Sequence, residues 1–152
     1  MHSTATNRST FTPTFGAIVG DDGVTFRAWA PAQQRMSVVL DGGREIEMER
    51  DSDGFFRARV ADLAVGQRYW YRLEQGLRPD PASRWQPEGP TGPSAIVDPR
   101  AYPWRDTEWS GAPELHRNVL YEMHLGTFTR DGTWKAAEQH LGGLRKLGIT
   151  TI

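Results

Sequence analysis

The chain has 152 residues, with 18 lysine and arginine residues against 19 aspartate and glutamate residues, and no cysteine. The lack of cysteine excludes a disulfide scaffold and cysteine-bearing metal sites. The net charge of −1 gives no electrostatic reason to expect nucleic acid or an anionic membrane as a partner. No apolar run approaches the roughly 18 residues of a membrane span, and residues 1–10 lack the apolar core of a secretory signal. We therefore expect a cytoplasmic protein.

Residues 14–75 have the pattern of an antiparallel β-sandwich. Residues 23–30 alternate apolar and polar side chains, as a half-buried strand does. Similar alternation recurs in four further short segments, residues 35–40, 45–49, 55–60 and 67–74. Short strands separated by turn signals every 8–12 residues or so are typical of a sandwich. Residues 1–13 precede this pattern, and we expect them to be disordered.

The proline content divides the chain. Eight of the ten prolines lie between residues 79 and 113. Because proline lacks a backbone donor and fixes φ, this section predicts a linking segment rather than regular strands or helices. We place the linker at residues 99–117, after a sandwich that extends to residue 98.

In the remaining residues, 118–152, the spacing of the apolar side chains differs from that of the sandwich strands. Residues 118–125 form a short apolar run typical of a strand, and residues 149–152 begin a second β-branched one. Between them, Trp134, Ala137 and Leu141 fall at helical spacing, with Thr133 as the expected N-cap and Gly148 just after the helix end. Strand, helix and strand predict a βαβ unit, which needs a larger parallel sheet around it. We expect this apolar surface to promote self-association.

Chemical motifs are few. The sequence has no HExxH zinc motif, no phosphate-binding glycine loop and no serine nucleophile elbow. Residues 51–54 predict a hairpin turn rather than a calcium loop, because Val60 stands where the loop would need glutamate. Glu45, Glu47 and Glu49 alternate with apolar residues and predict a solvated strand face. We expect no catalytic residue, no metal and no cofactor in this chain.

Two residues are weak candidates for substrate contact. Trp85 lies in the proline-rich section, where an exposed indole offers its apolar face for stacking on a sugar ring. Its alternative role is packing at the junction between the sandwich and the following domain. His124 ends the first strand expected after the linker, where α/β barrels place active-site residues. Its alternative is a buried histidine hydrogen-bonded to the backbone.

Several segments carry a family resemblance: RPDPASRWQPEGPTGPSAIVDP at 78–99, LYEMHLGTFTRDGTW at 120–134, LRKLGITTI at 144–152 and FRAWAP at 26–31. They resemble the maltooligosyl trehalose trehalohydrolases, a branch of the α-amylase family of glycoside hydrolases. The DPASR-x-QP-x-G-x-x-GPS run is the most specific of them. The YE-x-H-x-GTFT strand is shared in looser form with isoamylases and glycogen branching enzymes.

The resemblance implies a mainly β fold, with an immunoglobulin-like (early-set) sandwich, the linker, and the first β-α-(β) of a truncated (β/α)8 barrel. It implies that the parent enzyme hydrolyses the α-1,4-glucosidic bond of maltooligosyl trehalose to release trehalose. Family catalytic carboxylates would lie beyond residue 152, so this chain alone is expected to be inactive. Tyr121, Glu122, His124 and Gly126 match the family strand and are expected to serve as framework. The alternatives are the N-terminal domain of a glycogen branching or debranching enzyme, or a stand-alone α-glucan-binding module.

Overall fold

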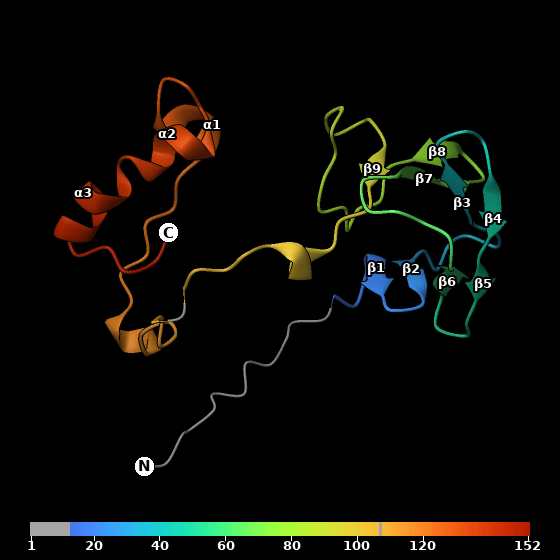
Figure 1. Cartoon of the computed structure of the whole chain (residues 1–152), viewed down its shortest axis with the longest axis horizontal. Helices are drawn as coiled ribbons and strands as arrows, with labels where there is room; N and C mark the ends of the chain where they lie inside the picture. The colour runs from blue at the N-terminus through green and yellow to red at the C-terminus, as the bar shows by residue number, and fades with distance from the viewer. Residues whose placement is uncertain (1–12, 107) are drawn as a thin grey trace, which may run out of the picture. The chain divides into compact units, whose positions relative to one another are not determined.

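The computed structural model describes residues 13–106 and 108–152 of the chain. The expectation of disorder for residues 1–13 therefore falls almost wholly outside the described residues. The chain divides into two compact units, with the boundary in the sequence between Pro103 and Trp104 (Figure 1). Of the described elements, the named strands lie in the first unit and the α-helices in the second. Among the described residues, no helix is long and apolar enough to cross a membrane.

Two antiparallel sheets form the first unit (Figure 1). Sheet A has the order β1-β2-β6-β5, with strands Gly16–Gly20, Gly23–Trp29, Phe55–Val60 and Glu49–Arg50. Sheet B has the order β4-β3-β7-β8, with strands Glu45–Glu47, Ser37–Leu40, Arg68–Leu73 and Gly76–Arg78. Strand β9, Ser94–Ala95, also pairs with β7.

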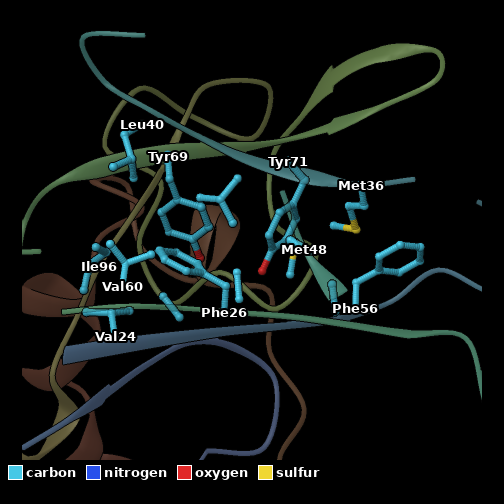
Figure 2. Close-up of a cluster of buried hydrophobic side chains, with 14 residues drawn as sticks. Val24, Phe26, Met36, Leu40, Met48, Phe56, Val60, Tyr69, Tyr71 and Ile96 are labelled. Carbon is cyan, nitrogen blue, oxygen red and sulfur yellow. The ribbon is translucent and has the colours of Figure 1, made fainter. Parts of the chain in front are cut away.

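The two sheets enclose one apolar core, shown in Figure 2. In β2, the side chains of Val24, Phe26 and Ala28 are buried, while the intervening side chains are less so, as the alternation predicts. The ring of Phe26 meets the ring of Tyr69 from β7 edge-on, with centroids 4.9 Å apart. This contact joins sheet A to sheet B, so the mainly β sandwich predicted from the sequence is confirmed.

The segment 45–49 differs from its prediction as one strand. Residues Glu45–Glu47 pair with β3 in sheet B, whereas Glu49–Arg50 pair with β6 in sheet A. Met48 lies between them with its side chain buried, and its N–H donates to the carbonyl of Met36 at 2.9 Å. The chain thus crosses from one sheet to the other at Met48, and the burial of this side chain stabilises the crossing.

The second unit, with the residues before it, contains two 3₁₀ turns, Pro99–Ala101 and Leu115–Arg117, and three short helices. The helices are α1 (Leu125–Phe128), α2 (Trp134–Glu138) and α3 (Leu141–Lys146). The strand expected at 118–125 is reduced to one parallel bridge between Leu120 and Thr151. A strand needs a paired neighbour, and residues 149–152 supply only this one bridge.

The helix expected over residues 133–148 is interrupted. Thr133 caps α2 as predicted, accepting a hydrogen bond from the N–H of Ala136 at 3.2 Å, and Gly148 takes the positive φ of a helix-ending residue. Residues 139 and 140 separate α2 from α3. Two consecutive glycines at 142–143, just after the interruption, lower the helix propensity of the first turn of α3. Among the described residues of this unit, Ala137 is the only buried apolar one.

Candidate functional site

The DPASR segment begins with a buried carboxylate. Asp80 is only 3% exposed, and its Oδ2 accepts hydrogen bonds from the hydroxyls of Tyr69 at 2.6 Å and Tyr71 at 3.2 Å. Its Oδ1 accepts from the N–H of Ala82 at 2.8 Å, and its own N–H donates to Ser94 Oγ at 2.9 Å. Buried charge is tolerated when its lone pairs are satisfied in this way. The segment that gave the most specific family signal is therefore anchored inside the sandwich.

The two tyrosines of this cluster are held neutral. Burial raises the pKa of the Tyr69 phenol well above its ordinary value of 10, and the negative charge of Asp80 raises it further. The same two causes, in the same order, raise the pKa of Tyr71. A neutral phenol remains a hydrogen-bond donor to the carboxylate. Tyr69 and Tyr71 thus serve as hydrogen-bond donors that hold the carboxylate of Asp80 in the core.

Arg84 ties the same segment to sheet A. Its guanidinium donates to the carbonyls of Phe15 at 3.0 Å and Ala17 at 3.2 Å. Between these carbonyls, Gly16 has φ +79°, and a Cβ there would lie 3.0 Å from the carbonyl oxygen of Ala82. Glycine at this position permits the close approach.

Trp85 follows directly on this anchored segment. Its carbonyl accepts from the N–H of Ala95 at 2.9 Å and from the hydroxyl of Ser83 at 3.0 Å, which fixes its backbone beside β9. The residue is nevertheless 52% exposed. The fold therefore presents an indole on a fixed backbone at the surface, an arrangement that suits binding because little freedom remains to be lost.

His124 lies in the second compact unit, whereas Trp85 lies in the first. It precedes α1 as its N-cap residue, and its side chain is exposed rather than buried as the alternative reading expected. Its Nδ1 lies 3.5 Å from the hydroxyl of Thr127, and its carbonyl accepts the N–H groups of Thr127 and Phe128 at 3.0 Å. Its closest polar contacts are thus with α1 itself.

Sequence reasoning missed a shallow groove on the outer face of sheet B. It is lined by Arg35, Met36, Ser37, Glu45, Glu47, Arg72, Leu73 and Glu74. Glu45 accepts hydrogen bonds from Ser37 Oγ at 2.6 Å and from Arg72 Nε at 2.9 Å, and these contacts hold the pKa of its carboxyl below the usual value. The charges that line the groove are therefore partly engaged with one another. The alternation of Glu45 and Glu47 with Ile46 indicated only that these side chains face solvent.

The described residues include no group of three potential metal ligands close together. What the sandwich does offer is a buried anchor at Asp80, an exposed indole at Trp85 and a polar outer face on sheet B. The family model for carbohydrate-binding module 48, the isoamylase N-terminal domain, matches residues 14–90. The chain belongs to this family.

Similarity to two enzymes covers more of the chain than the family model does. The chain is 42% identical over 140 residues to the malto-oligosyltrehalose trehalohydrolase of Saccharolobus solfataricus, covering 91% of this chain and 25% of that protein. It is 31% identical over 123 residues to a 1,4-α-glucan branching enzyme of Thermosynechococcus vestitus, covering 72% of this chain and 16% of that protein. The chain thus spans at most a quarter of the length of these relatives.

A solved structure also matches most of this chain. The chain superposes on a protein from Salmonella typhimurium, assigned provisionally as an α-amylase, with a TM-score of 0.77 and 42% identity. The superposition covers 91% of this chain and 24% of that chain. The resemblance to the trehalohydrolases is confirmed by the identity to the Saccharolobus solfataricus protein. Asp80, Trp85 and the residues of the groove lie within the carbohydrate-binding module 48 match, and His124 lies outside it.

Proposed function

We propose that this chain is the N-terminal part of a cytoplasmic glycoside hydrolase that releases trehalose from maltooligosyl trehalose by hydrolysing its α-1,4-glucosidic bond. Residues 14–98 are the carbohydrate-binding-type sandwich, residues 99–117 a linker, and residues 118–152 the start of a (β/α)8 barrel. The observation that carries the proposal is the 42% identity to the Saccharolobus solfataricus trehalohydrolase over 91% of the chain. It is higher, and covers more of the chain, than the identity to the branching enzyme.

The exposure of the second unit supports the barrel assignment. Trp134 is 74% exposed, and the side chains of Leu115, Leu120 and Leu147 are also open to solvent. Surface of this kind suits an element that packs against further strands and helices. The single parallel bridge between Leu120 and Thr151 is consistent with the first two strands of a parallel sheet.

The chain by itself is proposed to be non-catalytic. Glycoside hydrolysis by this chemistry needs a carboxylate nucleophile and a carboxylic acid facing one bond, about 5 Å apart. The carboxylates of the groove, Glu45 and Glu47, lie on a sandwich face and have no such role here. Its contribution to the enzyme is α-glucan contact, for which Trp85 is the proposed stacking residue on the sandwich and His124 a proposed contact on the barrel side.

A segment exchange tests the proposal. The matching quarter of the Saccharolobus solfataricus trehalohydrolase is replaced by this chain, and trehalose release from maltooligosyl trehalose is measured. The control replaces it with the corresponding segment of the Thermosynechococcus vestitus branching enzyme. Activity with this chain and not with the control is expected. A folded exchange protein without activity, or equal activity with both segments, contradicts the trehalohydrolase assignment.

The second candidate is the branching-enzyme type, which the 31% identity to that relative supports. The reciprocal exchange distinguishes it, because this chain would then restore branching when placed in the branching enzyme. A stand-alone α-glucan-binding module is the third reading, and the family match of residues 14–90 supports it. It requires that the isolated chain bind maltoheptaose while neither exchange protein is active.

A further inference from the structure

The outer face of sheet A carries an aromatic and cationic patch that none of the preceding functions uses. Along β2 and β6, the outward side chains are Thr25, Arg27, Trp29, Phe55, Arg57 and Arg59, and Phe15 just before β1 joins them. Trp29 is 61% exposed and Phe15 is 40% exposed. We call these residues the sheet A patch.

The indole of Trp29 is fixed at one edge. Its Nε1–H donates to the carbonyl of Asp53 at 3.2 Å, in the turn between β5 and β6. The backbone beside it is fixed too, because the N–H of Ala30 donates to the carbonyl of Gly54 at 3.0 Å. The hydrogen-bonding edge of the ring is thus satisfied within the protein, while most of the residue remains open to solvent.

A guanidinium is held on the same face of β2. Arg27 stands two residues before Trp29 on the same face of β2, and its guanidinium carbon lies 4.3 Å from the ring centre of Phe55 and 5.2 Å from that of Phe15. One of its N–H groups donates to the carbonyl of Thr14 at 3.1 Å. Cation–π contacts on two rings restrict this side chain, so its remaining donors keep a defined direction.

A second guanidinium lies across from the first. Arg57 pairs with Arg27 in the β2–β6 register. Its side chain makes no hydrogen bond or ion pair with any residue in 13–106 or 108–152. Arg59, also in the patch, pairs with Asp22 at 2.7 Å, and Glu49 on β5 stands opposite Arg57 in the strand register. The patch therefore combines one restricted indole ring with guanidinium donors, and two carboxylates offset part of its positive charge.

We propose that the sheet A patch is a binding platform for a short segment of α-glucan, separate from Trp85. The apolar face of one glucose ring stacks on the Trp29 indole, and Arg27 and Arg57 donate to the hydroxyls of the neighbouring glucose unit. The proposal rests on the carbohydrate-binding function proposed above. A neutral polyol fits better than an anionic partner, because Asp22 pairs with Arg59 and Glu49 stands opposite Arg57, so carboxylates already offset part of the positive charge of the patch. The groove on sheet B has no aromatic ring among its lining residues.

The test follows the six indole N–H resonances of the whole chain by NMR during titration with maltoheptaose. Each resonance is assigned by tryptophan substitution. Cellohexaose, which has β-linkages, serves as the control sugar. We expect saturable shifts of the Trp29 resonance at millimolar maltoheptaose. Trp29→Leu and Arg57→Gln are each expected to weaken binding by about threefold to tenfold, and the matched exposed control Trp134→Leu is expected to leave it unchanged. Circular dichroism establishes that each variant is folded.

The outcomes separate this inference from the function on which it rests. A shift of Trp85 with no change at Trp29 overturns the sheet A platform and leaves the proposed glucan binding in place. No shift at any tryptophan at tens of millimolar overturns both. A Trp29 resonance that changes with protein concentration and not with sugar assigns the patch to a contact between copies, and this overturns the platform as well.

Discussion

The hydroxyl of Tyr69 donates a 2.6 Å hydrogen bond to the buried carboxylate of Asp80, eleven residues further along the chain. Tyr69 lies on β7 of sheet B and its ring also packs against Phe26 of sheet A. One side chain thus connects both sheets to the segment that carries Trp85. The position of the exposed indole therefore depends on a polar contact inside the core.

Asp80→Ala should destabilise the sandwich strongly. It removes the acceptor for two buried tyrosine hydroxyls and leaves them unpaired, each at about 1–3 kcal/mol. We expect a loss of about 3 kcal/mol in the free energy of unfolding, measured by urea denaturation. Asp62→Ala is the control, because Asp62 pairs with Arg44 at the surface and its loss should leave the unfolding midpoint nearly unchanged. Equal midpoints for the two variants would contradict the anchoring role of Asp80.

Stability should fall at alkaline pH. The pKa values of Tyr69 and Tyr71 are raised in the folded state, so the folded protein holds protons that the unfolded chain releases. The stabilisation is complete below the unfolded pKa of about 10 and is lost as the pH rises above it, by up to about 1.4 kcal/mol per pH unit for each tyrosine. Denaturation midpoints between pH 8 and 11 measure this slope. Tyr71→Phe should reduce it, and an unchanged slope in that variant would argue against the assignment.

Gly16→Ala should cost more stability than Gly42→Ala. Both glycines have positive φ, +79° and +94°, so both substitutions strain the backbone by about 1–2 kcal/mol. A Cβ at Gly42 meets nothing within 4 Å, whereas a Cβ at Gly16 lies 3.0 Å from the carbonyl oxygen of Ala82 and 3.1 Å from Asp80 Oδ2. The difference in unfolding free energy between the two variants therefore measures the cost of placing a Cβ against Ala82 and Asp80. Equal losses would show that the DPASR segment can move away.

The positions of the sandwich strands were predictable from the sequence, because each strand shows its own alternation of apolar and polar side chains. Val24, Phe26 and Ala28 recur at the period of a pleated strand, and burial of one sheet face accounts for that period. The crossing at Met48 was not predictable, since alternation continues through residues 45–49 while the pairing partner changes from β3 to β6. Local pattern carries no information on which sheet a strand joins.

The candidate site was predictable only in part. Trp85 was identified from its residue type and its proline-rich surroundings, and it is exposed. The role of Asp80 was not recognised, because aspartate is usually at the surface and its tyrosine partners are distant in sequence. Nor were the contacts of Arg27 recognised, because its partners Phe15, just before β1, and Phe55, on β6, are distant in sequence. Pairings between distant residues are the part that a single sequence does not reveal.

The last prediction concerns unequal stability along the chain. Residues 24–29 belong to β2, which pairs with β1 on one side and β6 on the other and packs its buried side chains into the core. Amides at residues 119–124 have few partners: the N–H of Tyr121 donates to the carbonyl of Thr151 at 2.9 Å, and that of Val119 to Thr150 Oγ1 at 2.8 Å. Local opening needs little free energy where few buried contacts must break. We expect residues 119–124 to exchange at least about a hundredfold faster than residues 24–29, after correction for intrinsic rates.

Hydrogen exchange at two protein concentrations checks this prediction against self-association. If the exposed side chains of Leu120 and Trp134 contact a second copy, protection at residues 119–124 will rise with concentration, while that at residues 24–29 stays constant. Leu120→Ser would then restore fast exchange at the high concentration. Equal protection of the two segments at both concentrations would contradict the prediction. It would mean that contacts within the chain alone make residues 118–152 as stable as the sandwich.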